Sequence, residues 1–393
     1  MKTFYIKYIG CERRGLDAEQ LKNFLIANGL KRVNLPSKAD YLFLSTCGLS
    51  KLADCSLDAI KELDEYDGEL ILLGCLPSME LSKITNIFDG KILPSNRIEM
   101  IDDIFPEFNV KYAYIEDPNK ILSSKKEDNN LKDNIKRLLR FDSIRLKKKP
   151  HYNPTGMDID LGINIGVDNN NFIIRISNGC LGNCSYCTIK KAIGNLKSKP
   201  VNLILKEVDK AIAAKQFKIN LISSDTGSYG LDIKTDLPSL LSSILERDNR
   251  ITIEFIQDLH PAAICRFGDE LLNLIKTKRI KSILTAVQSG NRRILGLMNR
   301  PLDLNKFKGI IDLFKQAYPD LKLKTQIIAG FPTETSGEFN NSIDYVKSCG
   351  FDEFDIFGYF ENKSAESSKL LPKVSEEVIQ KRVDNANKIL QSL

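Results

Sequence analysis

Three cysteines, Cys180, Cys184 and Cys187, stand close together in the segment GCLGNCSYC, directly after the apolar run FIIRIS. Their C-x3-C-x2-C spacing allows three thiolates to bind three corners of a [4Fe-4S] cubane, and the glycines let the backbone approach the cluster. Three ligands leave one iron open. That iron can chelate the amino and carboxylate groups of S-adenosylmethionine, so that one electron cleaves the carbon–sulfur bond and releases a 5′-deoxyadenosyl radical. The loop therefore predicts a radical-generating centre.

A second set of thiols, Cys11, Cys47 and Cys75, is spread along the first eighty residues, and each cysteine follows a β-rich run: TFYIKYI, YLFLST or ELILLG. The carboxyl ends of neighbouring parallel strands lie on one rim of a sheet, so these thiols can meet in space. An isolated cysteine after a buried strand is usually a small core residue. The residues alone leave both interpretations open.

The remaining three cysteines stand in helical or helix-end contexts without partners, and we interpret them as structural: Cys55, Cys265 and Cys349. The total of nine is odd, and a chain of 393 residues needs no disulfide framework to fold. Only two histidines occur, which disfavours zinc sites of the Cys/His type and histidine-based acid–base chemistry. Metal-cluster binding is thus the better interpretation for the cysteines that group.

The overall composition indicates a cytoplasmic protein of two or three domains. Apolar residues make up 42% and charged residues 27%, within the range of soluble proteins. No run approaches the roughly 20 uncharged apolar residues that span a bilayer, and the N-terminus has no small-residue cleavage pattern, so we expect neither a membrane association nor a secretory signal. The net charge of +6 permits a nucleic-acid partner without requiring one.

Two α/β regions with a linker between them must position the cysteines. Residues 1–110 alternate strands with helices, one opening near Asp17, which predicts a parallel α/β domain. Residues 111–165 are rich in charge, which indicates a linker or crossover between the two regions. Within this segment, residues 136–149 include seven basic residues and one acidic residue. Such a stretch can contact phosphates, although a solvated linker is equally consistent.

A partial (β/α)6 barrel is expected over residues 166–372, followed by a C-terminal helix over residues 373–393. Six runs predict its parallel strands: FIIRIS, INLISS, TIEFI, SILTAV, LKTQIIA and FDIFGY. Chemistry is expected at the carboxyl ends of these strands. The fold class is therefore α/β, with an N-terminal parallel domain ahead of the barrel.

The cysteine loop after the first barrel strand resembles that of the radical SAM superfamily. The blocks GCLGNCSYCTIKKAIGNLKSKP, SSDTGSYGLD, AVQSGNRRILGLMNR and TQIIAGFPTET, in this order, resemble its methylthiotransferase family, and the resemblance covers roughly residues 3–361. IGCERRGLDAE, STCGLS and LGCLP fall where that family holds a second cluster. The sequences GCLGNCSYC and SSDTGSYG are most similar to those of the family members that modify C2 of N6-threonylcarbamoyladenosine at position 37 of tRNA.

The resemblance implies two [4Fe-4S] clusters, the second held by Cys11, Cys47 and Cys75, together with S-adenosylmethionine and a flavodoxin or ferredoxin as electron donor. It also implies a pocket for S-adenosylmethionine lined by residues of the active rim: Tyr186, Ser224, Asp225, Thr226, Gln288 and Gly330. Ordinary turn chemistry is the alternative explanation for several of these. We expect Lys190 and Lys191 to be solvated and His260 to cap a strand end.

The chain departs from the family pattern at three places. Arg14 stands where the family has asparagine, and YFENKSAESSKL replaces a proline, arginine and glycine-threonine pattern after the last barrel strand. The TRAM domain, a small tRNA-binding β-barrel, is not expected after the C-terminal helix. Its absence favours the alternative that the substrate is a protein or peptide. A non-catalytic iron–sulfur binding protein is a third interpretation.

Overall fold

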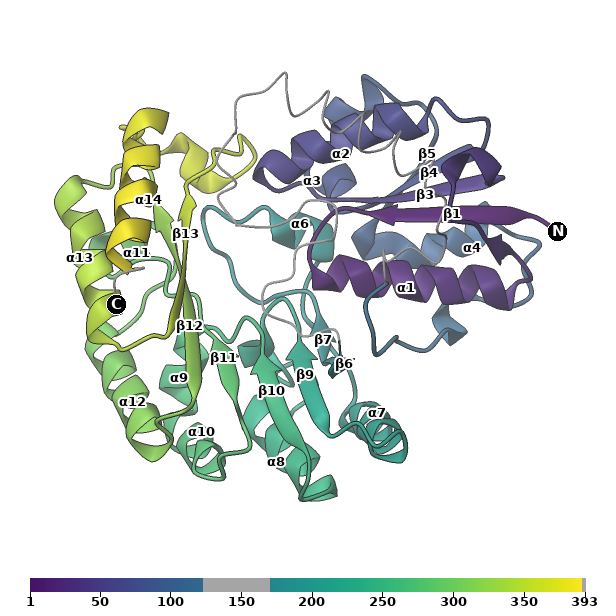
Figure 1. The fold of residues 1–393 in the computed structure, drawn as a ribbon. Helices are drawn as coiled ribbons and strands as arrows, with labels where there is room; N and C mark the ends of the chain where they lie inside the picture. The colour runs from purple at the N-terminus through teal and green to yellow at the C-terminus, as the bar shows by residue number, and fades with distance from the viewer. Residues whose placement is uncertain (123–169, 391–393) are drawn as a thin grey trace.

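A computed structural model describes residues 1–122 and 170–390, which form two parallel sheets with helices packed against them (Figure 1). The first sheet has the strand order β2-β1-β3-β4-β5, and all its pairs are parallel. Its strands are β1 (Thr3–Tyr8), β2 (Lys31–Arg32), β3 (Tyr41–Thr46), β4 (Glu69–Gly74) and β5 (Lys91–Pro94). The predicted runs thus form the three central strands.

Both faces of this sheet are buried, which explains why its central strands are continuous apolar runs. Along β3, Phe43 enters one core with Phe4 and Phe24, while Leu42 and Leu44 enter the core on the other face. The covering helices include α1 (Glu12–Ala27), α2 (Ser50–Leu63), α3 (Leu76–Thr85) and α4 (Ile101–Ile104).

Helix α1 begins at Glu12 rather than near Asp17, so the prediction of its start was wrong. Cys11 is its N-cap residue, and the charged sequence ERRG forms the first turn. Glu12 and Arg14 are buried there with polar partners: Gln257 donates to Glu12, and Arg14 pairs with Asp17 of the same helix and donates to Ser95.

The second sheet is an open, six-stranded parallel sheet with the order β13-β12-β11-β10-β9-β6, which confirms the predicted partial barrel. Its strands are β6 (Phe172–Arg175), β9 (Lys218–Ile222), β10 (Thr252–Ile256), β11 (Ser282–Leu284), β12 (Lys322–Ala329) and β13 (Glu353–Gly358). The main outer helices are α7 (Val201–Ala213), α8 (Leu237–Arg247), α10 (Gly268–Ile275), α12 (Leu304–Ala317) and α13 (Ser336–Ser348). A single large apolar core lies between these helices and the sheet.

The first turns of α1 face the inside of the barrel. Leu16 packs with Ile173, Ile222, Phe255 and Leu284, which come from four barrel strands. The two sheets therefore meet through α1, as Figure 1 shows at the junction of the purple and teal parts.

A buried ion network reinforces this junction. Arg175 on β6 contacts Asp17 of α1 and Asp117, and Lys199 lies 2.8 Å from Asp117. Within the segment predicted as a linker, Tyr112 and Leu122 are buried in the N-terminal core, so residues 112–122 pack as part of the fold. The basic stretch 136–149 lies outside the described residues.

The C-terminal helix α14 (Glu376–Leu390) packs on β12 and β13. Its Ile379 lies against Gly330 and Gly358, and its Arg382 pairs with Glu334 at 2.8 Å. Within the described ranges, no helix has the length and apolar character needed to cross a bilayer.

Candidate active site

The cysteine loop follows the first barrel strand, and its two ends are paired with each other. A short antiparallel pair, β7 (Ser177–Asn178) with β8 (Lys197–Ser198), joins its two ends. Gly179 has φ +76°, and a Cβ there would lie 1.9 Å from the carbonyl oxygen of Asn195. Glycine is therefore required where the loop closes on itself.

The three thiols of the loop lie close enough to influence one another electrostatically. Burial, followed by the carboxylate of Asp225, raises the pKa of Cys180 to about 11, with smaller contributions from the other two thiols. Burial also raises the pKa of Cys187, and Cys184 adds to the effect. The structure thus brings together the three cysteines that the spacing pointed to.

The loop backbone leaves room around these sulfurs. The Gly182 N–H donates to Cys180 Sγ at 3.1 Å. A Cβ on Gly182 would lie 3.2 Å from Cys180 Sγ and 3.8 Å from Cys184 Sγ, so only glycine keeps this space open. Across the described residues, no three His, Cys, Asp or Glu side chains converge on a point where a single metal ion would fit. Thiolates that bind different irons of a cubane are farther apart than ligands of one ion, and the space that Gly182 leaves beside Cys180 and Cys184 is compatible with such a cluster.

The N-terminal thiols also converge, on the rim of the first sheet. Cys11 precedes α1, Cys47 follows β3, and Cys75 follows β4 as the N-cap residue of α3. Burial and then the neighbouring Cys75 raise the pKa of Cys47, and Cys11 contributes as well. Gly74, with φ +102°, allows this convergence because a Cβ there would lie 2.2 Å from the Thr46 carbonyl oxygen.

Arg14, which departs from the family pattern, lies within this second group of thiols. Its guanidinium pairs with Asp17 at 2.7 Å and contacts Ser95, whose hydroxyl lies 3.9 Å from Cys75 Sγ. Burial raises the pKa of Cys75, and the positive charge of Arg14 opposes that rise. Arg14 thus supplies positive charge where three thiolates would gather.

The two sets of three cysteines lie on either side of the contact between the N-terminal sheet region and the barrel. Helix α6 (Ile189–Ile193), which follows the barrel loop, packs against α3, which follows Cys75. Cys75 and Met79 form a small apolar cluster with Ala192 and Ile193. Arg13 extends from α1 to the barrel rim, where Nη1 donates to the Ser223 carbonyl at 2.8 Å and to Asp258 Oδ2 at 2.7 Å.

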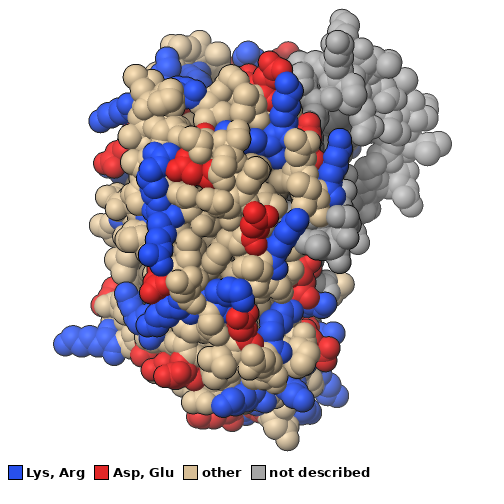
Figure 2. Space-filling model, turned by 90° about the vertical axis from the view of Figure 1, so that its left-hand side faces the viewer, with Lys and Arg blue, Asp and Glu red and all other residues tan. Residues whose placement is uncertain are grey.

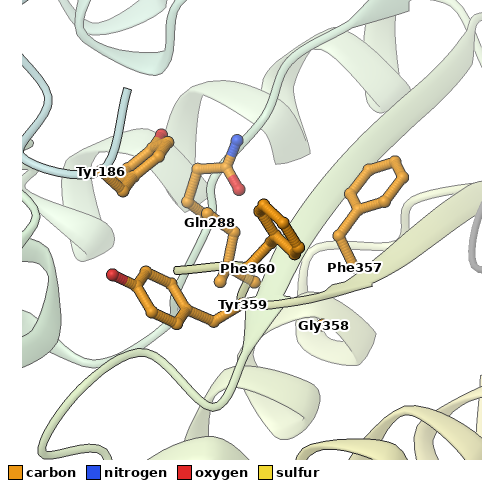
Figure 3. Close-up of a pocket in the computed structure, with 7 residues that line it drawn as sticks. Tyr186, Gln288, Phe357, Gly358, Tyr359 and Phe360 are labelled. Atoms are coloured by element: carbon orange, nitrogen blue, oxygen red, sulfur yellow. The ribbon is translucent and has the colours of Figure 1, made fainter. Parts of the chain in front are cut away.

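A cavity of about 170 Å³ opens beside the cysteine loop (Figure 3). Tyr186 and Gln288, both predicted pocket residues, line it together with side chains from the ends of β12 and β13: Ile328, Phe357, Tyr359 and Phe360. These last residues were not predicted, although the aromatic run FDIFGYF at a strand end was a usable signal. Four of the residues that line the cavity are aromatic, and aromatic side chains pack favourably against a planar ring.

The other predicted pocket residues do not line this cavity. Asp225 and Thr226 lie on the same rim, and each has a buried oxygen without a protein partner, Asp225 Oδ1 and Thr226 Oγ1; Gln288 Oε1 is a third such atom. Buried polar atoms without partners are rare, so these oxygens are available to a polar ligand. Ser224 lies beside them, half-buried.

Gly330 lies where α14 packs on the barrel, and its contact with S-adenosylmethionine stays a prediction. It has φ +78°, and its N–H donates to Glu334 Oε2 at 2.7 Å. A Cβ would lie 2.3 Å from Ile379 Cγ1, so glycine is required there by the packing of α14.

Two other expectations need correction. Lys190 is not simply solvated, because its Nζ donates to the Gly182 carbonyl at 3.0 Å and so holds the cysteine loop. Lys191 is exposed, as expected, and its side chain also donates to the Ser364 carbonyl at 3.1 Å. His260 caps a helix rather than a strand end, since its Nδ1 accepts the Ala262 N–H at the start of α9 (Pro261–Arg266). Burial, followed by nearby arginines, lowers the pKa of His260 to about 3, so it stays neutral.

Comparisons with known proteins agree with this arrangement. Residues 174–346 match the radical SAM superfamily, and residues 3–93 match the uncharacterized protein family UPF0004. The chain is 29% identical over 364 residues to a probable threonylcarbamoyladenosine tRNA methylthiotransferase of Pyrococcus horikoshii, covering 91% of this chain and 77% of the relative. It is 28% identical over 386 residues to the ribosomal protein uS12 methylthiotransferase RimO of Thermosipho melanesiensis, covering 97% and 81%.

Among solved structures, the fold is similar to that of TsrM, a radical S-adenosylmethionine methyltransferase from Kitasatospora setae. The TM-score is 0.60 at 11% sequence identity, over 94% of this chain and 77% of TsrM. The chain therefore contains a region that matches the radical SAM superfamily, it is similar along nearly its whole length to methylthiotransferases, and these relatives support a transferase.

Proposed function

We propose that this enzyme inserts a methylthio group at C2 of N6-threonylcarbamoyladenosine, at position 37 of tRNA. The observation that carries the proposal is the pair of cysteine groups on facing rims, joined through the packing of α3 on α6. Radical formation and sulfur delivery must act on one substrate atom, so the two centres have to face a common space. Relatives named for this tRNA modification support the choice of substrate.

Each group of residues has a distinct role in this proposal. Three thiols of the barrel loop hold one [4Fe-4S] cluster, and three thiols of the N-terminal rim hold a second: Cys180, Cys184 and Cys187, and Cys11, Cys47 and Cys75. When bound, the first cluster with S-adenosylmethionine supplies a carbon-centred radical, and the second supplies sulfur for the methylthio group. A flavodoxin or ferredoxin would be the electron donor.

The rim and cavity residues bind and orient S-adenosylmethionine in this account. The cavity beside Tyr186 and Gln288 accepts the adenine ring, whose flat faces suit the aromatic lining. The oxygens of Asp225 and Thr226 that have no protein partner accept or share hydrogen bonds with the polar groups of the ligand. Leu16 and the barrel residues it contacts close the base of the space and exclude water.

Substrate binding would depend mainly on phosphate contacts. On the face shown in Figure 2, the described Lys and Arg side chains are interspersed with Asp and Glu rather than gathered in one band. We place the tRNA contact on the segment 136–149 because it is the most basic stretch of the sequence. Neutralising several phosphates would make binding steeply dependent on salt.

Nucleoside mass spectrometry tests the choice of substrate. The reconstituted enzyme is incubated with S-adenosylmethionine, a reductant and either tRNA carrying N6-threonylcarbamoyladenosine or a peptide from ribosomal protein uS12. The expected result is a methylthio adduct on the nucleoside and none on the peptide. The reverse result would favour the second candidate, a protein substrate, which the similarity to RimO supports.

A further inference from the structure

The segment 297–300, at the end of α11 (Arg292–Leu297), holds the middle of the cysteine loop. The Ser185 N–H donates to the Met298 carbonyl at 3.0 Å, and the Ser185 hydroxyl donates to the Leu297 carbonyl at 2.7 Å. Asn299 Nδ2 donates to the Asn183 carbonyl at 2.7 Å. Both chain neighbours of Cys184 are thus fixed to one short segment.

The last residue of this segment reaches the sulfur itself. Arg300 Nη1 donates to Cys184 Sγ at 3.4 Å, within the range of an N–H···S hydrogen bond, and Nη2 donates to the Ala286 carbonyl at 2.7 Å. The planar guanidinium is therefore anchored at one nitrogen while the other points at the sulfur. Arginine keeps its positive charge under all ordinary conditions.

The electrostatic surroundings of the loop sulfurs are unequal. Cys184 receives a cationic donor, whereas Cys180 Sγ lies 3.9 Å from the carboxylate of Asp225. Hydrogen bonds to the sulfurs and nearby net charge are among the factors that set the reduction potential of an iron–sulfur cluster. A positive charge beside a ligand sulfur stabilises the reduced, more negative state more than the oxidised state, because attraction grows with the negative charge.

We propose that Arg300 is a positioning residue that orients Cys184 and raises the reduction potential of the cluster in the barrel loop. This inference rests on the proposed function only in requiring a [4Fe-4S] cluster on that loop. Its consequence is that the cluster becomes easier to reduce by a donor of low potential. The sequence offered no local sign of this, since 116 residues separate Arg300 from Cys184.

The test compares three variants of the full chain with both clusters reconstituted. R300Q removes the positive charge, and R300K keeps a positive charge but lacks the planar guanidinium with its two NH2 donors. N299A is the matched control, because it removes a bond from the neighbouring residue to the same loop without changing the charge. Iron content is measured first. A redox titration followed by electron paramagnetic resonance then gives the midpoint of the loop cluster, recognised by the change in its signal when S-adenosylmethionine is added.

For R300Q we expect the ratio of reduced to oxidised cluster at the wild-type midpoint to fall about tenfold, which for a one-electron couple is a lowering of about 59 mV. R300K should lie between R300Q and the wild type, and N299A should match the wild type. An unchanged midpoint in R300Q overturns the inference. Equal shifts in R300Q and N299A also overturn it, because loop geometry would then be the cause.

Two further outcomes are decisive. A shift in R300Q that appears only after S-adenosylmethionine is added overturns the inference, because Arg300 would then act on that ligand. If R300Q does not retain iron, R300K takes its place: a midpoint below those of the wild type and N299A supports the inference, and a wild-type midpoint overturns it. A wild-type protein with no cluster on the loop would instead refute the proposed function.

Discussion

Arg13 joins the N-terminal domain to the barrel rim, and its replacement by glutamine is expected to weaken that junction. The side chain is 13% exposed, and its Nη1 lies 2.8 Å from the Ser223 carbonyl and 2.7 Å from Asp258 Oδ2. Hydrogen bonds from a charged group contribute about 1.5–3 kcal/mol each. Breaking a buried ion pair costs about 3–5 kcal/mol, but water can reach Asp258, which is 24% exposed. We therefore expect R13Q to lower the free energy of unfolding by about 2–3 kcal/mol.

Urea denaturation of R13Q and of a matched control measures this effect. Arg247 pairs with Asp209 at 2.8 Å, a similar distance, but the two side chains are 42% and 50% exposed. An exposed pair contributes less than about 1 kcal/mol, so R247Q should move the midpoint much less. Equal destabilisation by the two variants would refute the reasoning, because burial would not be deciding the cost. Since Arg13 lies two residues after Cys11, R13Q should also reduce methylthiolated product more than cleavage of S-adenosylmethionine.

Three other perturbations follow from the described contacts and the sequence. G179A places a Cβ 1.9 Å from the Asn195 carbonyl, so the loop should not close and bound iron should fall by about half; full iron content would contradict this. Burial raises the pKa of Glu334 to about 7, so its contribution to stability is complete below pH 4.5 and is lost as the pH rises through 7. E334Q should flatten that fall, measured as unfolding free energy from pH 4.5 to 8, and an unaltered profile would show that Glu334 is not its source. Lys147, Lys148 and Lys149 lie outside the described residues. Neutralising them should reduce the slope of log K for tRNA binding against log salt concentration by about two to three, and an unchanged slope would place the phosphate contacts elsewhere.

The central strands and the position of the cysteine loop could be predicted because local patterns determine them. The runs over Tyr41–Thr46 and Glu69–Gly74 are apolar on both faces, as buried parallel strands must be. The strands β2 and β5 were missed because they have two and four residues and lack such a run. The rule that strand ends share a rim allowed Cys11, Cys47 and Cys75 to meet, but the family resemblance was needed to favour a shared site over three separate core residues.

The features that were missed depend on contacts between distant parts of the chain. The charged opening of α1 looked like a loop because the partners of Arg13 lie more than two hundred residues away. Arg300 has no local pattern that links it to the cysteine loop, and the aromatic run at the end of β13 does not by itself show that it lies beside Tyr186 of that loop. Lys190 looked solvated because the carbonyl it contacts becomes available only when the loop folds back.

Two triple variants of the cysteines test the central claim most directly, with cleavage of S-adenosylmethionine and methylthiolated product measured side by side. The wild type should bind about eight irons, cleave the cofactor and form product. Replacing Cys180, Cys184 and Cys187 by alanine should leave about four irons and abolish both reactions. Replacing Cys11, Cys47 and Cys75 should preserve cleavage to 5′-deoxyadenosine and abolish product alone. Product from this second variant, or cleavage by the first, would contradict the account of two centres with separate roles.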